Sequence, residues 1–449
     1  MNYRSHLLAI VFCWIGLSAT AQEGESLLKV KGALNSRYMS TNNEGDLADF
    51  NAAVVFGHLK FDYKAKPWLS LTAQVNGLAI PSTKGIERRD AQTGMGPIYE
   101  AALYNLRTMD GNSEFALPIL NAQIEHDGHF ITLGRFLKDS QIFRTEQWPF
   151  PNALEGIWYE NYRADKTSWQ LAYIHRLAPR FSGDFETVGQ SIGVAPTGLD
   201  ETGNRSQYRG NVDSKVLLVA NYNRLFSNQF SIDFWNYYTN NVTNTLIVEP
   251  KLHLSETAVT LSAKAIYQLK IGDGGNANQS LTYQSDDQAI YLGLRAEKLM
   301  KKGLLQFNFS RITDDGRMLL PREWGYEPYY TFQRRTRIEG TKDAWAMMLK
   351  WQNSWSNDAG NYRFFTSVAH NEMPEVTDFS RNKYYLPSHV HWDASVRFQP
   401  SKVLNGLSAE VLLAKRFLTA DVNGDLAAVI NRADFLHFDF ILSYSLNLK

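Results

Sequence analysis

Arginines and aromatic residues gather in residues 314–340 of the chain. This segment carries Arg317, Arg322, Arg334, Arg335 and Arg337 among tryptophan, tyrosine and phenylalanine residues. A guanidinium group can hold a carboxylate through two parallel hydrogen bonds, so such a segment could bind or guide anions. Acidic residues in the same segment balance the arginines, which predicts a structured charged cluster and not a loose tether.

One short pattern could belong to a hydrolase. Gly189-Gln-Ser191-Ile-Gly193 matches the G-x-S-x-G motif, in which a serine nucleophile lies on a strained turn between a strand and a helix. Neither a buried strand before it nor a helix after it is visible in the sequence. We therefore expect a chance match in a loop, and we predict no enzyme.

Two other patterns suggest metal ligands. His389, His391 and Asp393 alternate and could bind a metal, but they stand at the start of a strand beside a loop, and we expect them to be polar residues that line the lumen. The run that begins at Asp421 starts like a calcium loop, but Leu426 stands where such a loop needs glycine. The sequence therefore predicts no metal site and no cofactor, and a loose calcium contact of an external loop stays open.

The elements that must position these residues are β-strands. Apolar and mostly polar residues alternate along residues 435–449, which is typical of a strand with lipid on one side and water on the other. The apolar face of this strand comprises Leu436, Phe438, Phe440, Leu442, Tyr444, Leu446 and Leu448. The opposite face is mostly polar and includes His437, Asp439, Ser443, Ser445 and Asn447.

Runs of this kind recur along the chain and number about 18. Short turns alternate with long connections such as residues 179–211, 272–287, 314–343 and 370–388. Short periplasmic turns and long external loops are typical of outer-membrane barrels. The predicted fold is therefore all-β: an antiparallel transmembrane β-barrel of about 18 strands with long extracellular loops and inward-folded loops.

Side chains alternate between the two faces of a strand, and this alternation decides which charged residues point into the lumen. A charge on the lipid face costs about 2 to 4 kcal/mol at the membrane midplane, so basic residues opposite apolar ones must point inward. The basic residues placed inward in this way are Lys264, Arg295, Lys350, Arg363, Arg397 and Arg416. Acidic residues also point inward, at Asp233, Glu249, Asp393, Glu410 and Asp439. Two interpretations stay open: a generally polar, water-filled lumen, or a basic track for anions.

Loops rich in proline and aromatic residues are expected to fold into the barrel mouth and narrow it. Residues 314–340 are one such loop, and residues 134–156, with Arg144, Pro149 and Pro151, are the other. The alternative is that the 314–340 loop caps the extracellular mouth, where its arginines contact anionic lipopolysaccharide.

The N-terminus predicts export. An apolar run follows Arg4 and His6, and Ala19 and Ala21 form an A-x-A cleavage site, so residues 1–21 are expected to be a signal peptide. Residues 22–449 would then form a single barrel domain, integral to the outer membrane of a Gram-negative cell. The one cysteine lies in the predicted signal peptide, so the mature chain forms no disulfide. The 46 basic residues balance 46 acidic ones, which argues against nucleic acid as a partner.

The chain resembles the OprD-like outer-membrane porins. The resemblance rests on Gly134-Arg135 at a strand end with the Arg144 to Gly156 segment, and on Trp324-Gly-Tyr-Glu-Pro-Tyr-Tyr330 followed by Arg337-Ile-Glu-Gly340. It implies an 18-stranded barrel in which inward loops form a narrow eyelet and a basic ladder guides carboxylate-bearing nutrients. The ladder would comprise Arg135, Lys264, Arg295, Lys350, Arg363 and Arg397. The eyelet would involve Arg144 and the loop from Arg317 to Arg337.

The predicted function is passive diffusion of small polar solutes, in particular carboxylate-bearing nutrients. The main alternative is a surface-binding or adhesin barrel with a plugged lumen, and a third is an outer-membrane esterase that uses Ser191. Expected partners are outer-membrane lipid and lipopolysaccharide, small solutes and the barrel assembly machinery, with the protein a monomer or a homotrimer. The chain departs from many outer-membrane proteins in ending on Lys449 where an aromatic residue serves as the assembly signal.

Overall fold

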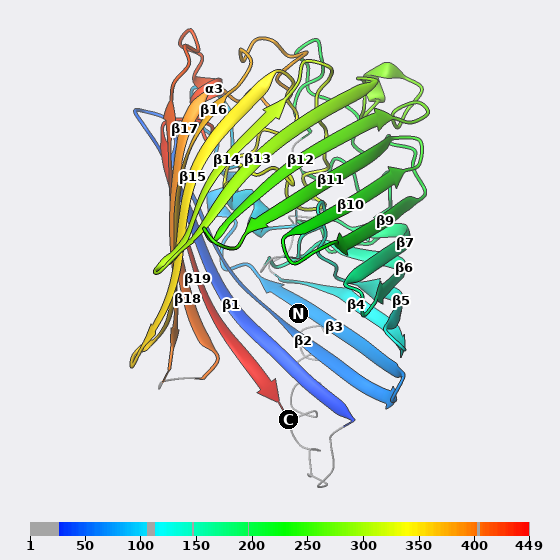
Figure 1. The fold of residues 1–449 in the computed structure, drawn as a ribbon. Helices are drawn as coiled ribbons and strands as arrows, with labels where there is room; N and C mark the ends of the chain where they lie inside the picture. Colours follow the sequence, from blue (N-terminus) through cyan, green and yellow to red (C-terminus); the bar gives the residue numbers. More distant parts are fainter. Residues whose placement is uncertain (1–26, 106–112, 146–147, 196, 402–404, 449) are drawn as a thin grey trace.

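The structure, a computed structural model, describes residues 27–105, 113–145, 148–195, 197–401 and 405–448. The predicted signal peptide lies outside these residues and stays a prediction. Within the described part, the chain forms a closed antiparallel barrel of 18 long strands, as the sequence predicts (Figure 1). The first and last strands, β1 and β19, pair from Val30 with Leu448 to Asn43 with Phe435 and close the barrel.

The barrel strands follow each other around the wall in sequence order. They are β1 (Leu28–Asn43), β2 (Phe50–Lys66), β3 (Leu69–Ala79), β4 (Ser113–His126), β5 (His129–Phe136), β6 (Ala153–Tyr162), β7 (Thr167–Ala178), β9 (Leu217–Leu225), β10 (Phe230–Thr239), β11 (Thr243–Leu254), β12 (Val259–Lys270), β13 (Gln288–Met300), β14 (Gly303–Ile312), β15 (Ala344–Asn357), β16 (Gly360–Glu372), β17 (His389–Pro400), β18 (Leu407–Leu418) and β19 (Phe435–Leu448).

Small elements lie in the long loops. The two-residue strand β8 (Glu186–Thr187) pairs with β7, and the helical turns are α2 (Lys84–Glu87), η1 (Glu100–Leu103), η2 (Gln279–Leu281) and α3 (Leu426–Val429). Among the described residues, no helix is long and apolar enough to cross a membrane.

Side chains alternate between a lipid face and an inner face. In β13, Leu292 and Leu294 are 49% and 59% exposed on the outside, whereas Tyr291 is fully buried inside. In β19, Leu436 and Leu442 are exposed and His437, Asp439 and Ser443 are buried, which confirms the predicted phase of this strand. An apolar outer surface this extensive needs lipid around it. Together with the fold, this surface places the barrel in the outer membrane.

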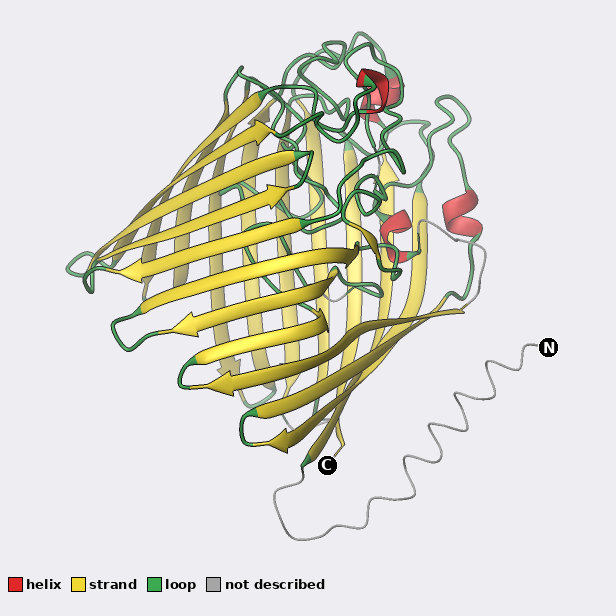
Figure 2. Ribbon diagram, turned by 90° about the vertical axis from the view of Figure 1, so that its right-hand side faces the viewer, coloured by secondary structure: helices red, strands yellow, loops and turns green. Residues whose placement is uncertain are grey.

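The long loops gather at one end of the barrel, and the short turns lie at the other end (Figure 2). Several long loops enter the lumen, where their side chains pack against the inner wall. The largest buried cluster joins wall residues such as Trp158 and Ile247 to loop residues such as Phe143, Ile192 and Trp324. Much of the core is thus inside the barrel, on the loop side.

Candidate functional site

The 313–343 loop, which connects β14 to β15, crosses the lumen. On one side it is held by β11, β12 and β13. Tyr330 donates its backbone N–H to the Tyr291 hydroxyl at 3.0 Å and its own hydroxyl to Glu249 Oε1 at 2.9 Å. Lys264 Nζ donates to the carbonyl oxygen of Pro328 at 2.9 Å. These bonds fix the middle of the loop to the inner wall.

The other side of the loop reaches strands β16 to β19. Gln333 donates to Ser367 Oγ at 2.9 Å, and Arg334 forms an ion pair with Glu410 at 2.5 Å. Arg335 forms an ion pair with Asp439 and donates from Nε to His437 Nε2 at 2.9 Å. Because these partners line the inner wall, the two arginines lie inside the barrel and not among lipopolysaccharide groups outside it. That the loop sets the pore width stays a proposal.

The 137–152 segment, which connects β5 to β6, also enters the lumen. It touches the 313–343 loop through an isolated bridge between Phe143 and Gly325. Gln141 fixes it to the wall, because its side chain accepts a hydrogen bond from Lys264 Nζ at 2.8 Å and donates one to Glu249 Oε2 at 3.1 Å. Asn76 of β3 donates to the carbonyl oxygen of Pro149 at 3.2 Å. Both segments that the sequence singled out are therefore folded structures in the lumen.

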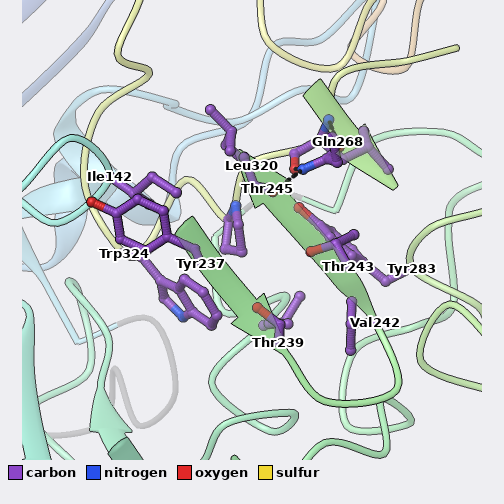
Figure 3. A pocket seen from close by; sticks show the side chains of 13 residues that line it. Ile142, Tyr237, Thr239, Val242, Thr243, Thr245, Gln268, Tyr283, Leu320 and Trp324 are labelled. Carbon is purple, nitrogen blue, oxygen red and sulfur yellow. Dashed lines mark hydrogen bonds between the residues drawn. The ribbon is translucent and has the colours of Figure 1, made fainter. Parts of the chain in front are cut away.

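On the loop side of this crossing, side chains of the 313–343 loop and of strands β10 to β12 surround a small cavity (Figure 3). The cavity left there measures only about 10 Å³ and is lined by Trp324, Tyr237, Tyr283 and their neighbours. Gln268 secures the contact by donating to Thr245 Oγ1 at 3.0 Å and to the carbonyl oxygen of Leu319 at 2.8 Å. This part of the lumen has little room for a solute.

On the other side of the crossing, towards the short turns, lies an open cavity of about 570 Å³. Its lining comes from the 313–343 loop, the 137–152 segment and strands β11 to β15. Five basic side chains line it: Arg144, Lys251, Lys264, Arg295 and Lys350. Three acidic side chains face the same space: Asp139, Glu249 and Glu327. Basic charge therefore exceeds acidic charge in this cavity.

The five cations differ in their partners. Lys264 and Lys251 share the carboxylate of Glu249, at 3.3 and 3.2 Å. The guanidinium of Arg295 donates to Asn308 Oδ1 at 2.6 Å and lies 4.2 Å from the centre of the Tyr330 ring. Lys350 lies over the Phe365 ring, and Arg144 is exposed. Within the described part of the chain, no carboxylate forms an ion pair with Arg144, Arg295 or Lys350.

The cavity also has an aromatic wall. Tyr326 and Phe332 of the 313–343 loop are half-buried, and their ring centroids lie 4.6 Å apart. A planar apolar group could pack on these rings while an attached anion faces the cations. The sequence pointed to aromatic residues in this loop but gave no sign of which rings would face open space.

Arg363, Arg397 and Arg416 share the inner-face parity that the sequence assigns to them. Arg363 is exposed near the turn end of β16, in register with Arg397 of β17. Arg397 forms an ion pair with Glu410 at 2.7 Å. Arg416 is buried and donates to the backbone carbonyl oxygens of Arg432 and Arg335. Arg363 is exposed, Arg397 is half-buried and Arg416 is buried, and none of them lines the 570 Å³ cavity.

Arg135 does not follow the prediction. The strand register sets it opposite Leu120, an exposed residue of the lipid face, and opposite Glu155, with which it forms an ion pair at 2.6 Å. It therefore shares the outward face of β5 with Leu133. The charge is tolerated because Glu155 neutralises it and the Phe185 ring covers it at 4.3 Å. The place of Arg135 in a lumen ladder is wrong.

Three arginines of the 313–343 loop bind other groups of the protein. Arg317 is buried and binds Glu201 at 3.1 Å and the backbone of Phe379, which ties separate extracellular loops together. Arg322 binds Glu339 at 2.6 Å under the Tyr384 ring. Arg337 donates to the carbonyl oxygen of Gly325 at 2.8 Å. These contacts give the three arginines a structural part in the loop, and their place in the constriction stays a prediction.

The structure offers no nucleophile at Ser191. This side chain is fully buried, donates to the carbonyl oxygen of Val188 at 2.7 Å and accepts from Trp324 Nε1 at 2.9 Å. A buried serine with both hydrogen-bonding roles filled cannot attack a substrate. As for metals, no group of three histidine, cysteine, aspartate or glutamate side chains within the described ranges is placed to hold an ion.

We expect Ser191→Ala to leave any hydrolysis of nitrophenyl esters at the background rate of the wild-type protein. Its effect should be structural, because Trp324 Nε1 loses its acceptor in the packed region. The cost is about 1 kcal/mol of unfolding free energy. Urea unfolding in lipid vesicles, followed by the heat-modifiable gel mobility of the barrel, measures this loss. An ester activity that disappears in the variant would show that Ser191 is catalytic.

The buried carboxylate of Glu327 should make the stability of the folded barrel depend on pH. This carboxylate accepts the backbone N–H groups of Ile338 and Glu339, at 3.1 and 2.9 Å. Burial raises the pKa of Glu327 to about 7 from an ordinary value of 4.5, and Arg337 offsets part of this rise. A raised pKa means that the folded state binds the proton more tightly than the unfolded state. The resulting stability is complete below about pH 4.5 and is lost as pH rises through about pH 7.

The urea midpoint of the wild-type barrel should therefore fall between about pH 5 and about pH 8, by an amount equivalent to at most about 3 kcal/mol. Glu327→Gln should remove this part of the slope, because an amide carries no charge at either pH. Glu256→Gln, in the exposed turn between β11 and β12, is the matched control. Equal slopes in the two variants would contradict the prediction.

Comparisons with known proteins reveal similarity in structure. No family model and no curated protein sequence matches the chain. Acinetobacter baumannii OccAB4 matches with a TM-score of 0.68 and 12% identity, over 94% of this chain and 99% of that one. Pseudomonas aeruginosa OccK8 (OprE) matches with a TM-score of 0.68 and 10% identity, over 94% and 98%. The chain has the fold of the OprD-like outer-membrane porins.

A third neighbour is P. aeruginosa OpdK, whose structure was solved with vanillate. It matches with a TM-score of 0.64 and 12% identity, over 94% of this chain and 99% of that one. The OprD-like fold that the sequence predicted is thus confirmed across nearly the whole barrel. At this level of identity the likeness describes the fold, and the function depends on the lumen of this chain.

Proposed function

We propose that the protein is a passive diffusion channel for small carboxylate-bearing solutes. One observation carries the proposal: Arg144, Arg295 and Lys350 line a cavity of about 570 Å³ without an ion-paired carboxylate among the described residues. Cations that are not neutralised by the protein attract anions from solution, and charges that line a pore select the opposite sign. The OprD-like fold supports a channel, because its structural neighbours are porins.

The aromatic wall narrows the class of solute. Tyr326 and Phe332 lie in the same cavity as the three cations, so a carboxylate on a planar ring could use both surfaces. Vanillate, which was present in the OpdK structure, is a solute of this chemical kind. We therefore propose aromatic carboxylates as the preferred solutes. Outer-membrane lipid would surround the barrel, and the assembly machinery and the monomeric or trimeric state remain predictions.

The test is conductance of the purified mature protein in planar lipid bilayers. We expect steady current steps without ATP or a proton gradient, and reversal potentials in a salt gradient that show anion preference. Benzoate should permeate better than benzylammonium, a cation of similar size. Clear cation selectivity would refute the carboxylate proposal. Silence across many insertions of folded barrels would favour the plugged, surface-binding barrel.

A further inference from the structure

A chain of buried hydrogen bonds connects the 313–343 loop to the barrel wall through one histidine. His437 of β19 is fully buried, and its Nε2 lies 2.9 Å from Nε of Arg335 in the loop. Its Nδ1 lies 2.8 Å from Thr41 Oγ1 of β1, which donates to Glu100 Oε1 at 2.6 Å. Glu100 belongs to η1 in the loop between β3 and β4.

The donors and acceptors of this chain allow one tautomer. A guanidinium group can only donate, so Nε2 of His437 must accept from Arg335. The ring proton then lies on Nδ1 and is donated to Thr41. A second proton on Nε2 would place two donors against each other and a cation beside a guanidinium group. The bond between Arg335 and His437 therefore requires a neutral imidazole.

The charges around His437 come from every element packed against it, and most are positive. Arg335 enters from the loop, Arg37 from β1 and Arg416 from β18, and His391 of β17 is a further group that can become charged. The negative charges are Asp439 on β19 itself, which binds both Arg37 and Arg335, and Glu100. The hydroxyl of Tyr99 also lies close, where it donates to the carbonyl oxygen of Arg335 at 2.9 Å.

Acid would weaken one of these negative charges as well. Burial raises the pKa of Glu100 to about 7, and the hydrogen bond from Thr41 limits the rise. As pH falls below about 7, this carboxylate is increasingly neutral, so less negative charge remains to offset a protonated His437. Protonation of both groups changes the cluster in the same direction, towards repulsion of Arg335.

We propose that protonation of His437 is an acid switch that releases residues 333–336 of the 313–343 loop from β17, β18 and β19. Burial and the guanidinium groups disfavour a charged imidazole while Arg335 is bound, so acid acts by stabilising the released state, in which His437 is hydrated and charged. Release also breaks the ion pair between Arg335 and Asp439. The loop then opens a gap beside strands that it otherwise covers, and the channel widens. This inference rests on the proposed function, because it assumes that the lumen conducts.

His389 makes a matched comparison within the same interface. It is fully buried in β17, its Nδ1 donates to the carbonyl oxygen of Pro387 at 2.8 Å, and its Nε2 lies 3.1 Å from Thr336 Oγ1 of the loop. A threonine hydroxyl can turn from donor to acceptor, so protonation of His389 can keep this bond. Arg335 has no such freedom. The switch is therefore specific to His437.

The experiment records single channels of the mature protein in planar bilayers between about pH 7.5 and about pH 5. Wild-type channels should spend a several-fold larger fraction of time in a wider conductance level at the acidic end. His437→Gln keeps an acceptor for Arg335 but takes up no proton, so it should stay in the narrow level throughout. His389→Gln and Glu100→Gln should each retain the acid response. Loss of the response in either of these with its survival in His437→Gln would overturn the proposal.

Hydrogen exchange separates the switch from the channel function. The protection factors of amides in residues 331–337, corrected for intrinsic exchange, should fall on acidification in the wild-type barrel and not in His437→Gln. Unchanged protection in the folded wild-type barrel would overturn the switch even if acid altered the current. Absence of current at every pH, with the protection change present, would instead refute the proposed channel and leave the release of the loop established.

Discussion

Replacing residues 314–342 by a short turn is expected to raise the single-channel conductance several-fold. The strands on either side can be joined without disturbing the barrel, because Ile312 pairs with Ala344 and Asp343 donates its backbone N–H to the carbonyl oxygen of Thr313 at 3.0 Å. The loop between these ends crosses the lumen from β11 to β19. Its removal opens the cross-section that it occupies, and current through a narrow pore grows with the open area.

Anion preference should weaken in the same variant. Deletion removes Arg334 and Arg335, which neutralise Glu410 and Asp439 on the inner wall. The wider lumen also lets ions pass farther from the remaining cations, whose charge is then screened by water and salt. Reversal potentials in a salt gradient measure this change together with the conductance.

Removal of residues 420–424 is the control for the loop deletion. These residues belong to the loop between the neighbouring strands β18 and β19, and none of them lines the 570 Å³ cavity. It should alter the conductance little. If the 314–342 deletion folds, as judged by heat-modifiable mobility, and conducts like the wild-type protein, then this loop does not set the constriction.

The wall of the barrel could be predicted from the sequence because its rule is local. In β13, Leu292 and Leu294 alternate with Arg295, and the cost of placing a charge in lipid decides which face is which. The same rule places Lys264, Lys350, Arg363, Arg397 and Arg416 on the inner face. Arg135 was assigned by resemblance alone. It follows Leu133 in parity and is therefore outside.

The interior of the barrel could be predicted only in part, because its contacts join residues far apart in the chain. The 313–343 loop was expected in the lumen from its composition. Arg317 is enclosed by Glu201 and Phe379, and no pattern near residue 317 indicates these partners. Gln141, which joins Lys264 to Glu249, lies in a segment that the sequence marked as unusual without indicating its bonds. Spacing along one strand predicts a face, but it does not predict which loop covers that face.

The combined substitution of Arg295→Gln and Lys350→Gln is expected to lower the ratio of anion to cation permeability by about an order of magnitude. Each side chain faces the cavity without an ion-paired carboxylate in the described part of the chain. A unit charge about 4 Å from a passing ion contributes about 1 kcal/mol in water, which corresponds to roughly fivefold in local anion concentration. Two such charges in one cavity act on the same ion.

The matched control is Lys301→Gln with Lys302→Gln. These two lysines form the exposed turn between β13 and β14, so the control removes the same charge from the protein but outside the lumen. Salt screens charges beyond about 10 Å, and this variant should therefore keep the wild-type selectivity. Arg295→Lys with Lys350→Arg should keep it as well, because the charges remain in the cavity. If the two glutamine pairs changed the reversal potential equally, net charge would explain selectivity and the cavity would have no special part in it. The geometry of the cavity requires that the ratio of anion to cation permeability fall in the variant with Arg295→Gln and Lys350→Gln and stay unchanged in both controls.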